Sequence, residues 1–180
     1  CEQIYKNAWD NLSLILKDAN EHSVIIMDLD ETVLDNSKYQ IGLVKKNESY
    51  NPESWSLWVN VNEAELVPGA KEFIDSVHKT NVRIIFLSNR MAKNELPTIK
   101  NMKALDIYDD DAFMLRIDKS DKKHIRRAEV IEGTGRMKEV GPMNVLAYFG
   151  DARHDFPDPS NDYIFGQNMF MLPNPMYGKW

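Results

Sequence analysis

Five short and largely apolar segments recur along the chain, and polar residues follow them. The segments span 24–28, 82–87, 113–117, 145–149 and 169–172. An apolar run of this length, without alternation of polar and apolar residues, is typical of a strand that is buried on both faces. The five segments therefore predict five strands of one parallel sheet.

Helical stretches separate the predicted strands. The sequence predicts helices over 2–18, 69–80, 93–105 and 121–132. Alternation of strands and helices implies a parallel sheet with helices on both faces and right-handed crossovers. We therefore expect an α/β fold, with a Rossmann-like parallel sheet of about five strands flanked by helices. A length of 180 residues with 43% hydrophobic content suits a single core.

Residues 34–66 break this alternation. The segment is polar and aromatic, and its rings include Tyr39, Tyr50, Trp55 and Trp58. Ordinary connections between a strand and a helix have about 2–6 residues, so an excursion of this length predicts an insertion that covers the site. We expect residues 1–33 and 67–180 to form the core domain, and residues 34–66 to form a small, mainly helical cap.

The charge balance and the apolar pattern exclude several classes of partner. The chain has 22 Lys and Arg against 28 Asp and Glu, which gives a net charge of −6. Proteins that bind nucleic-acid polymers collect surplus Lys and Arg to displace counterions, so no such polymer is expected as a partner. No apolar run approaches the roughly 20 residues that a membrane span needs. Cys1 is the single cysteine and can form no internal disulfide.

Two acids, Asp28 and Asp30, directly follow the first predicted strand. Acids separated by one residue at a strand end can face the same pocket while the residue between them turns into the core. One carboxylate can then act as a nucleophile, and the other can carry a proton to the leaving group and from water. A calcium-binding loop starting at Asp28 is excluded, because Val33 and Tyr39 stand where that loop needs Gly and Glu. A loop of acids without a function is the remaining alternative.

Polar residues also follow other predicted strands. Ser88 can bind a phosphoryl oxygen with its hydroxyl, although a serine that caps a helix gives the same pattern. Lys123 can neutralise a nucleophile and a phosphate, although the basic run 122–127 as a whole suits a solvated helix face. Asp151 and Asp155 follow the fourth strand, and oxygen ligands in this number suit Mg²⁺.

In this order, the four segments resemble the motifs of the haloacid dehalogenase (HAD) superfamily: Asp-x-Asp-x-Thr, then Ser, then Lys, then Gly-Asp-x-x-x-Asp. The resemblance to the bacterial class C acid phosphatases is closer still and spans nearly the whole chain. It is carried by segments 28–37 (DLDETVLDNS), 54–58 (SWSLW), 67–70 (VPGA), 88–90 (SNR) and 171–174 (MLPN). That group includes surface lipoproteins that act as 5′-nucleotidases, so the resemblance implies an acid phosphatase for small phosphomonoesters.

The resemblance implies a role for each matching residue. Asp28 would form an aspartyl-phosphate, and Asp30 would serve as general acid and base. Ser88, Asn89 and Lys123 would bind the phosphoryl group. The hydrolysis of phosphate monoesters needs up to about 10²¹-fold acceleration, which is consistent with the use of a metal, a lysine and a covalent intermediate.

Mg²⁺ is the cofactor that the resemblance implies. It would be held by the carboxylate of Asp28, the backbone carbonyl of Asp30 and Asp151, with Asp155 close by. Relatives usually carry Gly-Asp-Asn where this chain has Ala152 after Asp151, so the groups that support the metal are expected to differ here. Family members work without a catalytic histidine, which makes His154 a bystander.

Substrate selection would fall to the cap. By similarity to the nucleotidase members, Trp55 and Tyr177 would sandwich a nucleobase or a nicotinamide ring, as in nucleoside monophosphates or nicotinamide mononucleotide. Such stacking contributes roughly 1–3 kcal/mol per base. Packing within the lid is the alternative for each ring, and it is the preferred interpretation for Trp58.

Two other functions stay open at this point: a phosphatase of the same superfamily with a sugar or other phosphate substrate, and a non-catalytic surface binding protein. The filled catalytic positions favour an enzyme. The resemblance also implies a bacterial protein outside the cytoplasm, as an outer-membrane or surface lipoprotein or a periplasmic protein, attached to a membrane only through a lipidated Cys1. An arbitrary chain start would give the same first residue. The family usually continues beyond Trp180, so part of a C-terminal helix and of a homodimer surface is expected there.

Overall fold

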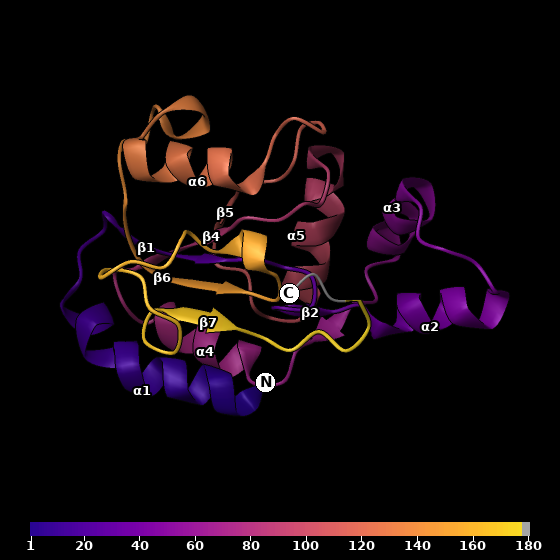
Figure 1. The fold of residues 1–180 in the computed structure, drawn as a ribbon, viewed down its shortest axis with the longest axis horizontal. Helices are drawn as coiled ribbons and strands as arrows, with labels where there is room; N and C mark the ends of the chain where they lie inside the picture. Colours follow the sequence, from indigo (N-terminus) through magenta and orange to yellow (C-terminus); the bar gives the residue numbers. More distant parts are fainter. Residues whose placement is uncertain (178–180) are drawn as a thin grey trace.

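A single five-stranded sheet forms the centre of the computed structural model, which describes residues 1–177 (Figure 1). Its strands are β1 (Ser23–Met27), β4 (Arg83–Phe86), β5 (Ala112–Phe113), β6 (Asn144–Gly150) and β7 (Met169–Met171). Their order is β5-β4-β1-β6-β7, and every neighbouring pair is parallel. The predicted parallel sheet is confirmed. The expectation about the chain beyond Trp180 lies outside the described residues.

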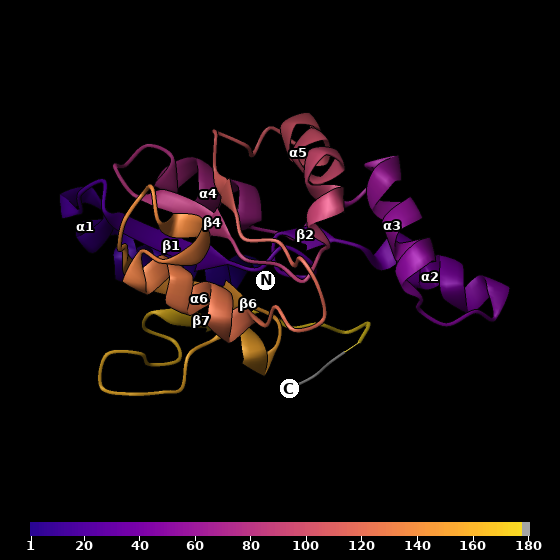
Figure 2. The same cartoon turned by 90° about the horizontal axis from the view of Figure 1, so that it is seen from above.

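Helices cover both faces of this sheet. They are α1 (Glu2–Asp18), α4 (Ala70–Val77), α5 (Glu95–Ala104) and α6 (Lys123–Glu132), with short 3₁₀ turns at η1 (Ala92–Asn94), η2 (Gly135–Met137) and η3 (Arg153–Asp155). Figures 1 and 2 show α1 and α4 on one face and α6 on the other. The expected α/β architecture is therefore confirmed. None of the helices within residues 1–177 combines the length and the apolar composition that crossing a membrane requires.

The packing of the central strand β1 explains why residues 24–27 are all apolar. Ile25 and Met27 pack into the cluster that includes α1 and α4, whereas Val24 and Ile26 pack into the cluster that includes Val130 of α6. Every residue of β1 is buried, because both faces of the sheet are covered by helices.

Strand β5 is shorter than the segment 113–117 predicted. It ends at Phe113, and the next carbonyl, that of Met114, accepts a hydrogen bond from Nη1 of Arg126 at 2.6 Å. The chain then follows the loop after β4, where the N–H of Arg116 donates to the carbonyl of Arg90. The buried guanidinium of Arg126 thus binds a carbonyl that would otherwise pair with a neighbouring strand.

Residues 34–66, between β1 and α4, form a helical projection, which we call the cap. It contains α2 (Ser37–Lys46) and α3 (Pro52–Val61), and β2 (Leu34–Asp35) pairs antiparallel with β3 (Glu65–Leu66) at its base. Figures 1 and 2 show both helices extending away from the sheet. Trp58 packs within the cap, since its ring lies 6.2 Å from that of Tyr39 and its Nε1–H donates to Asn36.

A matched pair of leucines on α1 tests the packing of this helix against the sheet. Leu12 is 2% exposed and Leu14 is 74% exposed. We expect Leu12→Ala to lower the free energy of unfolding by about 2–5 kcal/mol, because it leaves a cavity in the core. Leu14→Ala should change it by less than about 0.5 kcal/mol. Urea unfolding measures both, and equal losses would contradict the assigned face of α1.

Candidate active site

The carboxyl ends of the parallel strands meet at one edge of the sheet, below the cap. Asp28 follows β1, Ser88 lies just beyond β4 and Asp151 follows β6. A cavity of about 420 Å³ lies at this edge, where ligands bind in open parallel sheets. Eight of the predicted site residues line it: Asp28, Asp30, Trp55, Ser88, Asn89, Lys123, Asp151 and Tyr177. The ninth, Asp155, does not line the cavity but accepts a hydrogen bond from Lys123.

A sharp turn after β1 places two carboxylates at the cavity. Leu29 is fully buried, and its carbonyl accepts the backbone N–H groups of residues 33 and 34. Glu31 has φ of 60°, a left-handed conformation that is unfavourable for a residue with a side chain. Asp28 and Asp30 therefore both line the cavity, as the spacing predicts, while Leu29 turns into the core.

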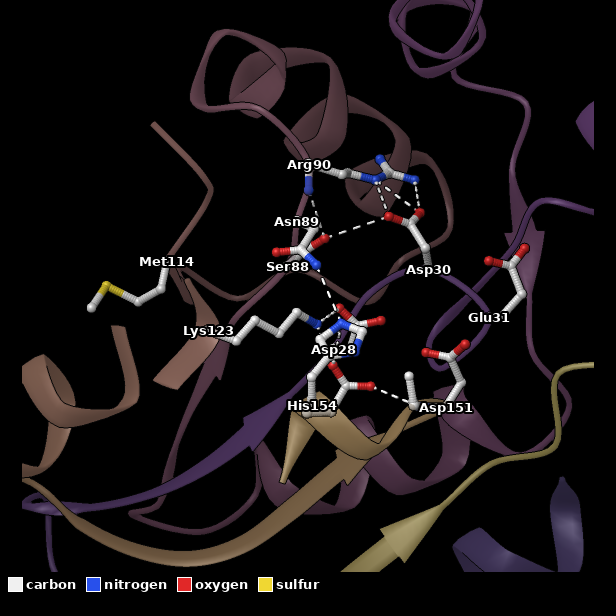
Figure 3. A network of polar contacts seen from close by, with 12 residues as sticks. Asp28, Asp30, Glu31, Ser88, Asn89, Arg90, Met114, Lys123, Asp151 and His154 are labelled. Atoms are coloured by element: carbon white, nitrogen blue, oxygen red, sulfur yellow. Dashed lines mark hydrogen bonds and ion pairs between the residues drawn. The ribbon is translucent and has the colours of Figure 1, made fainter. Parts of the chain in front are cut away.

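Lys123 forms the centre of the buried part of the site. As the first residue of α6, it places its ammonium 2.5 Å from Oδ1 of Asp28 and 2.5 Å from Oδ1 of Asp155. All three residues are buried. Burial by itself would lower the pKa of Lys123, but the charges of Asp28 and Asp155 raise it above its usual range. The lysine is therefore a cation, and Figure 3 shows it directed at Asp28.

The loop after β6 holds Asp155 in place. Oδ2 of Asp155 accepts the backbone N–H groups of Asp151 at 3.1 Å and Ala152 at 2.9 Å. A Cβ at Gly150 would overlap the side chain of Asp155, so only glycine fits there. Oδ2 of Asp151 accepts from Nδ2 of Asn174, at 2.7 Å, just beyond β7. The amide of Asn174, from the segment after β7, thus supports Asp151, whereas Ala152 contributes only its backbone N–H.

The site carries more negative than positive charge. Burial raises the pKa of Asp28 well above its usual range; Lys123 opposes this shift, and Asp155 and Asp151 add to it. Burial also raises the pKa of Asp151 to about 6, against the hydrogen bond from Asn174. Several buried carboxylates with a single ammonium are costly unless another cation compensates them.

The carboxylate cluster fits a divalent cation. Asp28, Asp151 and Asp155 each bring one oxygen within 4.8 Å of the others. Asp155 already accepts from Lys123 and two backbone N–H groups, so Asp28 and Asp151 are the better direct ligands. Hard divalent cations prefer such oxygen donors. A bound cation would also compensate the charge that raises the pKa of both carboxyl groups.

The loop after β4 is anchored from behind by Arg126. Its guanidinium donates to the carbonyl of Ser88 at 2.5 Å and to Oδ1 of Asn89 at 2.8 Å. Oγ of Ser88 accepts the N–H of Arg90 at 3.1 Å. His154 also lines the cavity, and its Nε2 lies 3.3 Å from Nδ2 of Asn89. The bystander role expected for His154 stays a prediction.

The aromatic residues of the cap form one wall of the cavity. The ring of Trp55 lies 5.1 Å from that of Tyr39 and 6.3 Å from that of Tyr50. Tyr177, beyond β7, also lines the cavity and donates its hydroxyl hydrogen to Glu31. Burial raises the pKa of Glu31 to about 8; the charge of Asp30 acts in the same direction, and the hydrogen bond from Tyr177 opposes it. Both rings of the expected stacking pair thus border the cavity.

Several residues of the site were not expected from the sequence. They are Glu31, Asn36, Arg90, Arg126 and Asn174, which bond to the predicted residues or to the loops that carry them. Four of them lie inside the segments that carry the family resemblance. This position shows that the four residues belong to a motif, but it does not show what each side chain does. Arg126 lies in a basic run that suits a solvated face, yet it is fully buried.

The comparisons with known proteins agree with this geometry. Residues 2–180 match the family described as HAD superfamily, subfamily IIIB (acid phosphatase). The structure is similar to that of the class C acid phosphatase from Bacillus anthracis, with a TM-score of 0.78, 29% identity and coverage of 98% of this chain and 77% of that chain. The tungstate-bound structure of that phosphatase gives a TM-score of 0.80, with the same identity and coverage.

A more distant similarity concerns the fold alone. A haloacid dehalogenase-like hydrolase from Streptococcus pneumoniae has a TM-score of 0.51 and 13% identity, over 73% of this chain and 77% of that chain. Fold and site together define a phosphohydrolase of the HAD type. The chain belongs to HAD subfamily IIIB, the acid phosphatases, and is a phosphomonoester hydrolase.

The raised carboxyl pKa values predict how the stability of the metal-free protein depends on pH. A carboxyl group whose pKa is higher in the folded state stabilises that state below its unfolded pKa, and this contribution is lost as pH rises through the folded pKa. For Asp151 the window runs from 3.8 to about 6. We therefore expect the melting temperature in EDTA to fall across this window more in the native protein than in Asp151→Asn.

Divalent cation should reverse this trend, because only ionised carboxylates bind it. In the native protein, the gain in melting temperature on adding the cation is expected to grow with pH. In Asp151→Asn this gain is expected to be smaller than in the native protein. Asp162→Asn, at an exposed position, serves as the matched control. A native protein and an Asp151→Asn variant with the same pH profile would contradict the assignment.

Proposed function

We propose that this protein is a Mg²⁺-dependent acid phosphatase that hydrolyses small phosphomonoesters through an aspartyl-phosphate formed on Asp28. The observation that carries the proposal is the buried contact of 2.5 Å between Asp28 and Lys123 at the end of β1. A second carboxylate, Asp30, borders the same cavity two residues later. A nucleophile, a cation for phosphate and a proton carrier therefore share one strand-end pocket.

The first chemical step follows from the placement of these residues. A carboxylate oxygen of Asp28 attacks phosphorus, and the bond between phosphorus and the leaving-group oxygen breaks. Asp30 gives its proton to that oxygen, so the leaving group departs as an alcohol. Lys123 stays charged beside Asp28 and stabilises the phosphoryl oxygens, together with the hydroxyl of Ser88 and the amide of Asn89.

The second step restores the enzyme. A water oxygen attacks phosphorus of the aspartyl-phosphate and gives its proton to Asp30, and the bond from phosphorus to the oxygen of Asp28 breaks. Inorganic phosphate leaves, and both aspartates regain their starting protonation states. Mg²⁺, held by Asp28, Asp151 and the backbone carbonyl of Asp30, would supply positive charge to the phosphoryl group.

A comparison structure supports the binding of a tetrahedral oxyanion by a protein of this fold. The class C acid phosphatase from Bacillus anthracis has been observed with tungstate bound. Tungstate is a tetrahedral oxyanion, as is phosphate, and the two proteins share 29% identity over 98% of this chain. We infer that the pocket around Asp28 and Lys123 binds the phosphoryl group here too.

The cap wall supports substrates that carry a ring. Trp55 and Tyr177 both border the cavity, so a nucleobase or a nicotinamide ring is the leaving-group feature that we propose they recognise. Nucleoside monophosphates and nicotinamide mononucleotide have such rings. A sugar phosphate would leave this aromatic wall without a partner, and a non-catalytic binding protein would not need the proton carrier Asp30.

The lipid attachment at Cys1, the location outside the cytoplasm and the homodimer stay predictions. In the structure, Cys1 is partly buried, and its carbonyl accepts the N–H groups of Ile4 and Tyr5 at the start of α1.

Replacement of the nucleophile tests the reaction. We expect Asp28→Asn to lower the turnover of p-nitrophenyl phosphate by about 10⁴-fold or more, as loss of a nucleophile does in other covalent enzymes. EDTA should abolish the activity of the native protein, and added Mg²⁺ should restore it. Asp18→Asn, at an exposed position, should behave as the native protein. Activity that survives Asp28→Asn in a folded protein would contradict the proposal.

Trp55 tests the substrate class. Loss of stacking of roughly 1–3 kcal/mol predicts that Trp55→Ala lowers kcat/KM for a nucleoside monophosphate by about 5–150-fold. The value for glycerol phosphate, which has no ring, should change little. Leu57→Ala on the exposed face of the same helix is the control. Equal losses on both substrates would exclude ring stacking by Trp55.

A further inference from the structure

The carboxylate of Asp30 is held by two side chains that no step above uses. The guanidinium of Arg90 donates to Oδ1 through Nη2 at 2.7 Å and through Nε at 3.0 Å, and Nδ2 of Asn36 donates to the same oxygen at 3.0 Å. Figure 3 shows Arg90 and Asp30 facing one another. The other oxygen, Oδ2, has longer contacts, at 3.2 Å from Nε of Arg90 and 3.4 Å from Oγ of Ser88.

The two oxygens of Asp30 therefore differ. Oδ1 accepts three N–H groups, and neither a guanidinium nor an amide NH₂ can take a proton from it. Oδ2 has only two longer contacts, and Asp30 lines the substrate cavity. We propose that Arg90 is a positioning residue that orients Asp30 so that Oδ2 transfers the proton to the leaving group. This inference rests on the role of Asp30 in the proposed function.

Arg90 is itself fixed by groups outside the cavity. Arg90 is 2% exposed, and its Nη1 donates to Oγ1 of Thr98 at 3.0 Å. That hydroxyl in turn donates to the carbonyl of Asn94, one turn earlier. The guanidinium therefore presents two N–H groups to Asp30 in a fixed planar arrangement. The single, flexible ammonium of a lysine does not reproduce this arrangement.

Both donors of Asp30 also contact a tryptophan of α3 in the cap. The guanidinium carbon of Arg90 lies 5.8 Å from the centre of the Trp55 ring, and Oδ1 of Asn36 accepts Nε1–H of Trp58 at 2.8 Å. The wall that would face the leaving group and the acid that would protonate it are therefore linked by the same two side chains. A purely structural ion pair has no need of this link.

Leaving groups of different basicity separate positioning from structure. When the bond from phosphorus to p-nitrophenolate breaks, the anion is stable and needs little help from an acid. When the leaving group is an alkoxide, it must receive the proton of Asp30 as the bond breaks. kcat/KM reports this first step even where the hydrolysis of the aspartyl-phosphate limits kcat.

The experiment compares kcat/KM for p-nitrophenyl phosphate and glycerol phosphate in Arg90→Met, Arg90→Lys and Thr98→Val. General acid catalysis contributes about 10²–10⁴-fold, so we expect Arg90→Met to lose at least about 30-fold more on glycerol phosphate than on p-nitrophenyl phosphate. Arg90→Lys should show most of the same selective loss on glycerol phosphate, because a single ammonium cannot hold Oδ1 through two N–H groups.

Thr98→Val keeps the shape of a buried residue and removes the hydroxyl that links Arg90 to the carbonyl of Asn94, so it remains informative if Arg90→Met does not fold. It should show a smaller loss with the same preference for glycerol phosphate. Arg83→Met, at the exposed start of β4, is the control and should leave both substrates unaffected.

Each outcome bears on the inference. Equal losses on the two substrates, or full recovery in Arg90→Lys, would overturn the positioning role of Arg90 while the native activity upholds the proposed function. A native protein that hydrolyses neither substrate would overturn the proposed function and this inference together.

Discussion

The contact of Lys123 with Asp28 and Asp155 is the interaction on which the rest of the site depends. A buried ammonium between two buried carboxylates is stable only if its distances are short and the remaining oxygens are satisfied. The loop after β6 meets the second condition, because two backbone N–H groups bind Asp155 and glycine at position 150 leaves room for its side chain. Burial and the neighbouring carboxylates raise the pKa of Asp28 and Asp151, and a divalent cation bound between them would compensate this cost.

The site consists of two halves with different origins. In the proposed function, the core supplies the phosphate half from the ends of β1, β4 and β6, whose positions are set by the sheet. The cap would supply the leaving-group half from aromatic side chains of α3. Asp30 lies where the halves meet, and its partners Arg90 and Asn36 each contact a tryptophan of α3. The division corresponds to the chemistry, since phosphoryl transfer is common to all substrates and the leaving group is not.

Local sequence predicted most of the fold, because a strand that is buried on both faces of a sheet has a continuous run of apolar residues. The run at 24–27 is apolar throughout, since these residues of β1 are covered by a helix on one side or the other. The segment 113–117 has a similar composition, yet its strand ends at Phe113, because the guanidinium of Arg126 on α6 donates a hydrogen bond to the carbonyl of the next residue. Composition does not record a partner that lies 12 residues away in sequence and meets the strand only after folding.

The sequence by itself determined the parallel sheet, the excursion at 34–66 and the acids at the strand ends, because these depend on local hydrophobic patterns and on short motifs. Only the tertiary structure decided how the acids are held. Arg90 and Asn174 reach Asp30 and Asp151 across 60 and 23 residues, and their partners could not be read from their neighbours in the chain. The physical reason is that hydrogen-bond geometry and burial are properties of assembled elements, whereas hydrophobic periodicity is a property of each element alone.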